Sequence, residues 1–235
     1  PDDMLFLVPF AALPVLGVPL LARFAPALVP HWEWRSGPSG CFLPIARALG
    51  IAVPHTQACT AAGAPLPDRP QVAEGLEAIK QAAQPDGLRL LTGAPGCAST
   101  RAAVLLHLPQ AQVAQYAGHS DADPQAPESS GLALQDGWLT VADLSGVPLE
   151  GLDLAVFSSC FGGSVQLSPG RALVGLPLTM LNQGTRAVIA ALWQVNADFN
   201  PAFSRELFGH LKDHGPIEAV RLAQAALFAE NPPRD

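Results

Sequence analysis

The sequence predicts an α/β protein with a mostly parallel central sheet, covered by helices on both faces in a three-layer α/β/α sandwich. One observation is the alternation along the chain of short apolar runs with segments of helical periodicity, the pattern that gives parallel strands joined by helical crossovers. The other is composition: 49% of the 235 residues are hydrophobic and 14% are charged. This is enough apolar chain for one large buried core, and we expect a single domain over residues 1–235.

The apolar runs with the length and composition of strands define the expected sheet. They are 5–10 (LFLVPF), 23–29 (RFAPALV), 87–92 (GLRLLT), 111–118 (AQVAQYAG), 152–159 (LDLAVFSS) and 185–193 (TRAVIAALW). Segments with helical periodicity separate or follow them. These are 41–50 (CFLPIARALG), 69–84, 99–108, 170–184, 201–215 and 215–230.

The opening segment from Met4 to Leu21 carries no charge and has the length of a membrane span. Pro9, Pro14 and Pro19 interrupt it, and proline inside a helix removes a hydrogen-bond donor and clashes with the preceding turn. Two short strands joined by a turn fit this segment better, so we expect a hairpin and no membrane partner. The net charge of −7 and the lack of basic runs also exclude a nucleic-acid partner.

Four cysteines are present, at positions 41, 59, 97 and 160, and none forms a C-x-x-C pair. A structural zinc site is therefore not expected. No secretory signal pattern is recognisable, so we expect free thiols in a reducing cytoplasmic compartment. His210 and His214 lie four apart without the glutamate of a zinc-protease helix, so we expect no metal.

The segment LLTGAPGCAST (90–100) resembles a phosphate-binding loop but lacks the lysine that would reach a nucleotide. Ser99 or Thr100 is better explained as the N-cap of the next helix. Two other segments are expected to be loops: the proline-rich 64–70, interpreted as a mobile surface excursion, and the acidic 120–131.

A histidine and a cysteine end two of the predicted strands. His119 follows the run 111–118, and Cys160 follows 152–159 and precedes Gly162 and Gly163. In an open α/β sheet, ligands bind at the carboxyl ends of the strands. A thiolate is a strong nucleophile, and a nearby imidazole can take its proton and return it to a leaving group. The alternative is that both are core residues that happen to end strands.

Several motifs in order resemble the CHAT domain, a caspase-like and separase-related family of prokaryotic cysteine peptidases. They are VPFAALP (8–14), ASTRAAVLLHL (98–108), QYAGHS (115–120), the stretch from LALQDGW to SSCFGG (132–163), and the stretch from GLPLT to LWQV (175–195). The resemblance covers almost the whole chain and implies a caspase-like fold. A typical member begins one strand earlier and continues past the last helix, so we expect this chain to be a fragment of a larger polypeptide.

The resemblance implies His119 as general base and acid and Cys160 as nucleophile, with no cofactor. It also implies an oxyanion hole formed by the backbone N–H groups of Ser120 and Cys160. Further residues are expected to bind the substrate: Gly118, Ser158, Gly162, Trp193, Val195 and Asp198.

Three positions depart from the family pattern. Ser120 replaces the usual glycine, Phe161 replaces an acidic residue, and Ser158 stands where specificity-determining residues occur in relatives. The residue after which a substrate would be cut therefore stays undetermined.

Two hypotheses from different classes follow. The first is a cysteine endopeptidase acting on a protein or peptide substrate, an effector of bacterial defence switched on by a fused or bound sensor. The second is a catalytically silent CHAT-like scaffold. The intact pair of His119 and Cys160 favours the enzyme.

Overall fold

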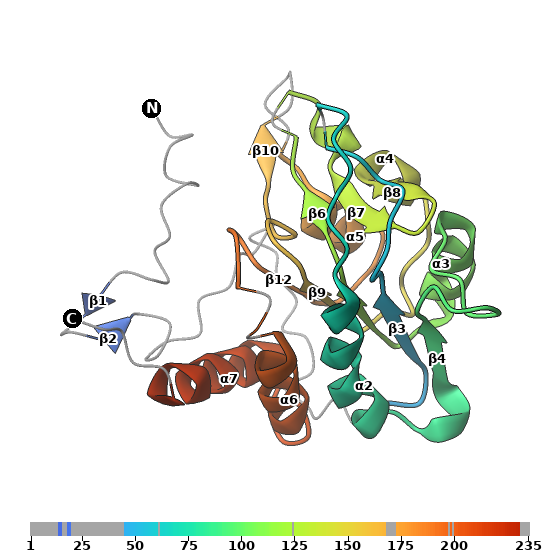
Figure 1. Ribbon diagram of the computed structural model, residues 1–235. Helices are drawn as coiled ribbons and strands as arrows, with labels where there is room; N and C mark the ends of the chain where they lie inside the picture. Colours follow the sequence, from blue (N-terminus) through green and yellow to red (C-terminus); the bar gives the residue numbers. More distant parts are fainter. Residues whose placement is uncertain are drawn as a thin grey trace.

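The computed structural model describes residues 14–15, 18–19, 45–60, 62–123, 125–167, 173–196, 198 and 200–230. Its centre is a parallel sheet of five described strands in the order β12-β9-β5-β3-β4 (Figure 1). These strands are β3 (Ala48–Ala52), β4 (Leu88–Leu91), β5 (Val113–Ala117), β9 (Leu154–Ser158) and β12 (Val188–Ala190). The predicted strands 5–10 and 23–29 lie outside the described residues.

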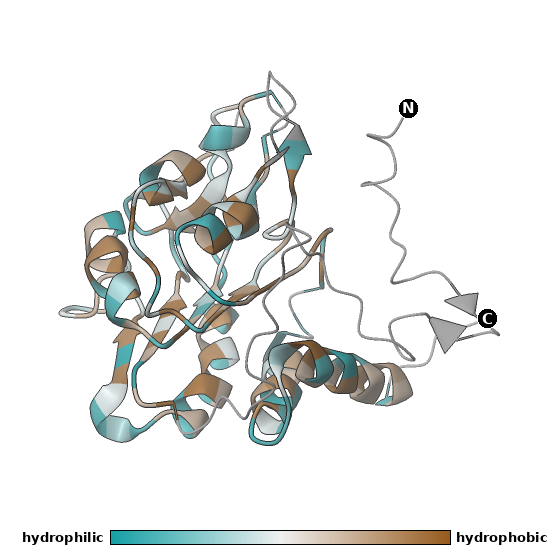
Figure 2. Ribbon diagram, turned by 180° about the vertical axis from the view of Figure 1, so that it is seen from behind, coloured by the Kyte–Doolittle hydropathy of each residue, from teal (hydrophilic) through white to brown (hydrophobic). Residues whose placement is uncertain are grey.

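Helices cover both faces of this sheet, which confirms the predicted α/β/α sandwich. One face packs against α3 (Arg101–His107), α4 (Val141–Leu144) and α5 (Leu176–Asn182). The other packs against η3 (Pro70–Leu76), α2 (Glu77–Ala82), α6 (Asn200–His210) and α7 (Pro216–Glu230). Hydrophobic and hydrophilic residues alternate along the covering helices (Figure 2). Strands β3, β5 and β9 are buried at every residue because both of their faces are covered.

The direction of winding reverses between β3 and β5. From β3 the chain crosses to β4 at one edge, then returns past β3 to β5 and continues outward through β9 to β12. Because each parallel crossover is right-handed, this reversal places α2 on the opposite face from α3, α4 and α5. A crevice opens at the carboxyl ends of the strands at such a reversal, and ligands of open α/β folds bind there.

A smaller antiparallel sheet extends from the carboxyl end of β5. It consists of β6 (Ser120–Asp121), β7 (Gly131–Leu134) and β8 (Gly137–Thr140). The expected loop 120–131 therefore begins as strand β6 and contains the short 3₁₀ helix η6 (Pro127–Ser129). The described chain also contains two short 3₁₀ helices, η4 (Pro85–Gly87) and η5 (Leu108–Gln110). Strand β10 (Gln166–Leu167) pairs with β11 (Leu173–Val174) in an antiparallel ribbon.

Two helix predictions need correction. The segment 41–50 was expected to be a helix, but Ala48–Ala52 forms β3 at the middle of the sheet. A fully buried apolar run has no polar face to reveal its period, so a strand and a helix look alike in sequence. The expected helix 170–184 is shorter: Leu173–Val174 pairs as a strand, and the helix runs from Leu176 to Asn182.

Other local predictions are confirmed. The Thr100 hydroxyl accepts a 3.3 Å hydrogen bond from the N–H of Ala103 and caps α3. Gly184 follows α5 with a φ of +106°, a left-handed conformation that favours glycine. In the opening segment, β1 (Pro14–Val15) and β2 (Val18–Pro19) form a short antiparallel hairpin.

The β5 tyrosine connects the two sheets. The hydroxyl of Tyr116, a fully buried residue, lies 2.7 Å from the carbonyl oxygen of Ala133 and 2.5 Å from that of His119. A Cβ built on Gly118 would lie 2.4 Å from this hydroxyl and 2.8 Å from the ring carbon that bears it. The missing side chain at Gly118 therefore makes room for the phenol that holds β6 and β7 to β5.

We expect Gly118→Ala to lower the free energy of unfolding by about 1–3 kcal/mol, the range for overpacking a buried site. Gly209→Ala is the matched control, because an added Cβ there meets nothing within 4 Å and Gly209 lies in helix α6. Replacing a helical glycine by alanine is expected to raise stability by roughly 0.5–1 kcal/mol. Equal stability of the two variants in urea unfolding would contradict the packing role of Gly118.

Candidate active site

His119 and Cys160 lie at matching positions beyond two neighbouring strands. Strands β5 and β9 are parallel, and their register pairs Ala117 with Ser158. His119 is two residues beyond Ala117, and Cys160 is two residues beyond Ser158. The two side chains therefore leave the same edge of the sheet at the same level, as the sequence predicts.

The turn after Cys160 runs along the segment that follows β12. The N–H of Phe161 donates to the carbonyl of Trp193 at 3.2 Å, and the N–H of Gly163 donates to that of Ala191 at 2.8 Å. Phe161 has a φ of +56°, the one left-handed non-glycine residue in the described part of the chain. These bonds hold the turn in place beside the candidate nucleophile.

The half-buried Cys160 thiol donates a 3.6 Å hydrogen bond to the carbonyl oxygen of Val195. Within the described residues it makes no hydrogen bond to His119, so the thiol and the imidazole are on one edge but not paired in this conformation. The backbone N–H of Cys160 has no hydrogen-bond acceptor in the described part of the chain.

The backbone N–H of Ser120 is also outside the sheet hydrogen bonds. Ser120 faces Leu132 in the β6–β7 pair, and the N–H of Ala133 donates to the carbonyl of His119 at 2.9 Å. This bond makes Ser120–Leu132 a non-hydrogen-bonded pair, in which the N–H and C=O of Ser120 point away from β7. The Ser120 hydroxyl donates to the Cys160 carbonyl and so connects the ends of β5 and β9.

The half-buried His119 ring has a polar partner that sequence analysis missed. Its Nε2 lies 2.8 Å from the carbonyl oxygen of Pro67 and 3.1 Å from Nε of Arg69. Partial burial lowers the pKa of His119 below its ordinary value; the bond to the Pro67 carbonyl opposes this, and the charge of Arg69 lowers the pKa further. The net lowering of the pKa favours the neutral imidazole, the form in which a general base accepts a proton.

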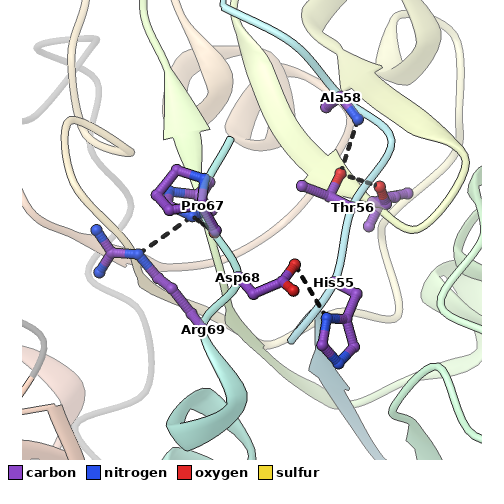
Figure 3. Close-up of polar contacts among 8 residues, drawn as sticks. His55, Thr56, Ala58, Pro67, Asp68 and Arg69 are labelled. Carbon is purple, nitrogen blue, oxygen red and sulfur yellow. Dashed lines mark hydrogen bonds and ion pairs between the residues drawn. The ribbon is translucent and has the colours of Figure 1, made fainter. Parts of the chain in front are cut away.

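Pro67 and Arg69 belong to a segment that we call the strap, residues 54–60 and 62–69, which follows β3. The sequence analysis interpreted its proline-rich part as a mobile excursion, but a set of hydrogen bonds and one ion pair fixes it across the carboxyl edge (Figure 3). They are Arg69 N to Pro54 O (2.8 Å), His55 Nδ1 with Asp68 Oδ1 (2.9 Å), Thr56 Oγ1 to Leu134 O (2.5 Å), Gln57 N to Gln135 O (3.1 Å) and Trp138 Nε1 to Cys59 O (3.0 Å).

The sequence signal for the strap is its place directly after a central strand, β3. The sequence analysis predicts a helix over 41–50 and therefore misses both β3 and the strap. Trp138 of β8 holds the strap through its indole N–H, which donates to the Cys59 carbonyl.

The predicted substrate-binding residues fall into two groups. Gly118, Ser158 and Gly162 are buried below the edge, and the Ser158 hydroxyl has no hydrogen-bond partner among the described residues. Trp193 and Asp198 are exposed, and Val195 is half-buried with its carbonyl on the thiol. The side chains of Phe161, Leu192 and Trp193 are 42%, 54% and 42% exposed, which gives the Cys160 turn an apolar rim.

The described residues contain no group of three or more histidine, cysteine or acidic side chains placed to hold a metal ion. The rings of His210 and His214 lie 6.1 Å apart at the end of α6. Cys59, Cys97 and Cys160 are free thiols. Among the helices that the structure describes, none combines the length and apolar character needed to cross a membrane.

Comparison with known proteins identifies the family. A search of curated protein sequences gave no match. Among solved structures, the chain is similar to one from the complex of Porphyromonas gingivalis RgpB pro- and mature domains, with 13% identity and a TM-score of 0.49. The match covers 80% of this chain and 44% of that one, so the present chain spans less than half of its length.

The family model described as the CHAT domain matches residues 1–234. This match covers the strand ends that carry His119 and Cys160 and both sheets described above. The chain therefore belongs to the CHAT-domain family.

Proposed function

We propose that this protein is a caspase-like cysteine endopeptidase in which Cys160 is the nucleophile and His119 the general base and acid. The observation that carries the proposal is the register of the adjacent parallel strands β5 and β9: each of the two residues lies two positions beyond the paired residues Ala117 and Ser158. Family membership supports the same reaction class.

The Pro67 carbonyl supports His119 as the base. A carbonyl only accepts hydrogen bonds, so the 2.8 Å contact is a hydrogen bond in the tautomer that carries its proton on Nε2. In that tautomer Nδ1 has the free lone pair and takes the proton of the Cys160 thiol. The resulting imidazolium keeps its bond to Pro67 while the thiolate attacks the scissile carbonyl carbon.

The free backbone N–H groups of Cys160 and Ser120 support an oxyanion hole. As the C–S bond forms, the carbonyl oxygen gains negative charge, which two fixed amide donors stabilise. The imidazolium then gives its proton to the leaving amine, and the peptide C–N bond breaks. Water, deprotonated by His119, hydrolyses the acyl-enzyme and regenerates the thiol.

The bond from the Cys160 thiol to Val195 supports a resting conformation. Catalysis in this mechanism requires the thiol to leave the Val195 carbonyl and turn to His119. Resemblance to CHAT domains leads us to propose that a fused or bound sensor triggers this change, and that the enzyme serves in bacterial defence. The exposed rim of Phe161, Leu192 and Trp193 supports contacts to the substrate at this turn.

Loss of either catalytic side chain is expected to abolish peptide cleavage. Cys160→Ala and His119→Ala would be compared with wild type on a peptide library and in labelling by an iodoacetamide probe, with the presumptive activator present. Cys97→Ala is the control, because it removes another free thiol, one that follows β4 on the far side of β3 from β5. If wild type neither labels at Cys160 nor cuts peptides, the silent scaffold is the correct hypothesis. If the alanine variants at 160 and 119 cleave like wild type, these two residues are not the catalytic pair.

The Ser120 amide can be tested without disturbing the sheet. Ser120→Pro removes the N–H but no ladder hydrogen bond, because that N–H points away from β7. We expect kcat/KM to fall by about 10²–10³, the usual cost of losing one oxyanion donor. Ser120→Gly loses the hydroxyl and keeps the N–H, so it should retain much more activity; equal losses in the two variants would contradict the oxyanion role.

The lowered pKa of His119 predicts the pH dependence. A histidine whose pKa is lowered stays neutral, and able to accept a proton, to a lower pH than usual. We therefore expect the acid limb of kcat/KM to lie below about pH 6.5, the unperturbed value for histidine. The profile would be measured after assays at pH 7.5 confirm that acid-exposed enzyme recovers fully. An acid limb above that value would rule out neutral His119 as the controlling group.

A further inference from the structure

The Nε2 atom of His119 has two neighbours whose demands are incompatible. The Pro67 carbonyl oxygen at 2.8 Å can only accept a hydrogen bond, and the Arg69 Nε–H at 3.1 Å can only donate one. A ring nitrogen has either a proton or a lone pair in its plane. Neutral His119 therefore satisfies one neighbour at a time, and each choice is a different tautomer.

The two tautomers differ at the other ring nitrogen. When Nε2 donates to Pro67, Nδ1 has a lone pair and can accept the thiol proton. When Arg69 donates to Nε2, the proton of the neutral ring is on Nδ1, and that nitrogen cannot act as a base. The shorter distance favours the bond to Pro67, but the bond from Arg69 is charge-assisted, and such bonds are about twice as strong as neutral ones. The two states therefore compete.

The backbone of the strap holds Arg69 in this position. Its N–H donates to Pro54 at 2.8 Å, and its carbonyl accepts from Val72 at the start of η3 at 3.1 Å. No carboxylate pairs with the Arg69 guanidinium in the described part of the chain.

The acidic residues Asp68 and Asp121 have other partners and do not alter the competition between Pro67 and Arg69 for Nε2 of His119. The neighbouring Asp68 is paired with His55 at 2.9 Å (Figure 3). Asp121 of β6 is exposed and accepts from the N–H of Ala122. Neither carboxylate draws Arg69 away from Nε2 of His119.

We propose that Arg69 is a positioning residue that controls which ring nitrogen of His119 carries the proton and keeps part of the enzyme in the idle tautomer. The proposal rests on the proposed role of His119 as general base. Withdrawal of the guanidinium from Nε2 leaves Pro67 as the sole partner, which shifts the ring to the working tautomer.

Three substitutions separate the donor of Arg69 from its charge. Arg69→Lys keeps a donor and a charge, Arg69→Gln keeps a donor without the charge, and Arg69→Met has neither. Two measurements would be made on each variant of the full chain: the tautomer and pKa of His119 by ¹⁵N NMR of labelled histidines, and the rate of Cys160 alkylation by iodoacetamide at pH 7.5. His119→Ala assigns the resonance among the six histidines.

In Arg69→Met we expect His119 to carry its proton on Nε2, its pKa to rise because a neighbouring cation is gone, and alkylation of Cys160 to accelerate between about two- and tenfold. Arg69→Gln should show the raised pKa with less of the tautomer change, and Arg69→Lys should stay close to wild type. A wild-type ring already fully in the Nε2–H tautomer, or an Arg69→Met variant with unchanged tautomer and pKa, would overturn the proposal.

The NMR measurement needs no peptidase activity. A protein that changes tautomer as expected but cuts no peptide would retain the Arg69 proposal for His119 and remove the proposed function. Cleavage that depends on Cys160 and His119, together with a His119 tautomer that Arg69 substitutions do not change, would retain the proposed function and remove the Arg69 proposal.

Discussion

The parallel pairing of β5 with β9 is the constraint on which the candidate site depends. Both strands lie inside the five-stranded sheet, are buried on both faces and are hydrogen-bonded in a register that sets Ala117 against Ser158. A shift by one residue would exchange the faces of every side chain in the strand and move hydrophobic residues out of their core. Burial therefore maintains the register, and the register keeps His119 level with Cys160.

Backbone hydrogen bonding at the carboxyl edge explains the chemistry of the site. Most of the groups that emerge from the sheet are paired: the His119 carbonyl with Tyr116 and Ala133, and the N–H groups of the Cys160 turn with the segment after β12. The N–H groups of Ser120 and Cys160 are left without acceptors in the described part of the chain. Two free N–H donors at this edge are groups of the kind that stabilise a negatively charged oxygen.

The strap connects the topology of the sheet with the state of the imidazole. It follows β3, next to the point where the winding reverses, and it reaches His119 from a strand on the other side of β5 from Cys160. The Pro67 carbonyl thus reaches the ring from the segment that follows β3. The Cys160 thiol lies beyond the end of β9, on the other side of β5. The same strap also brings Arg69 to the ring; the Pro67 carbonyl raises the pKa of His119 and the charge of Arg69 lowers it.

The amino-acid sequence alone was sufficient for the elements whose pattern is local. Strands β5 and β9 are apolar runs that precede His119 and Cys160, α3 begins after its predicted Thr100 cap, and α7 begins at Pro216, directly after Gly215. Strand β3 was not recognised, because complete burial removes the polar–apolar alternation that separates a strand from a helix. The tertiary structure alone decided the roles of Pro67, Arg69 and Trp138, since they act through contacts to residues 50 or more positions away along the chain, and 79 positions for Trp138 and Cys59. Strand spacing and side-chain type locate a candidate nucleophile and a candidate base, whereas the tautomer of that imidazole depends on atoms that only folding brings within hydrogen-bonding distance.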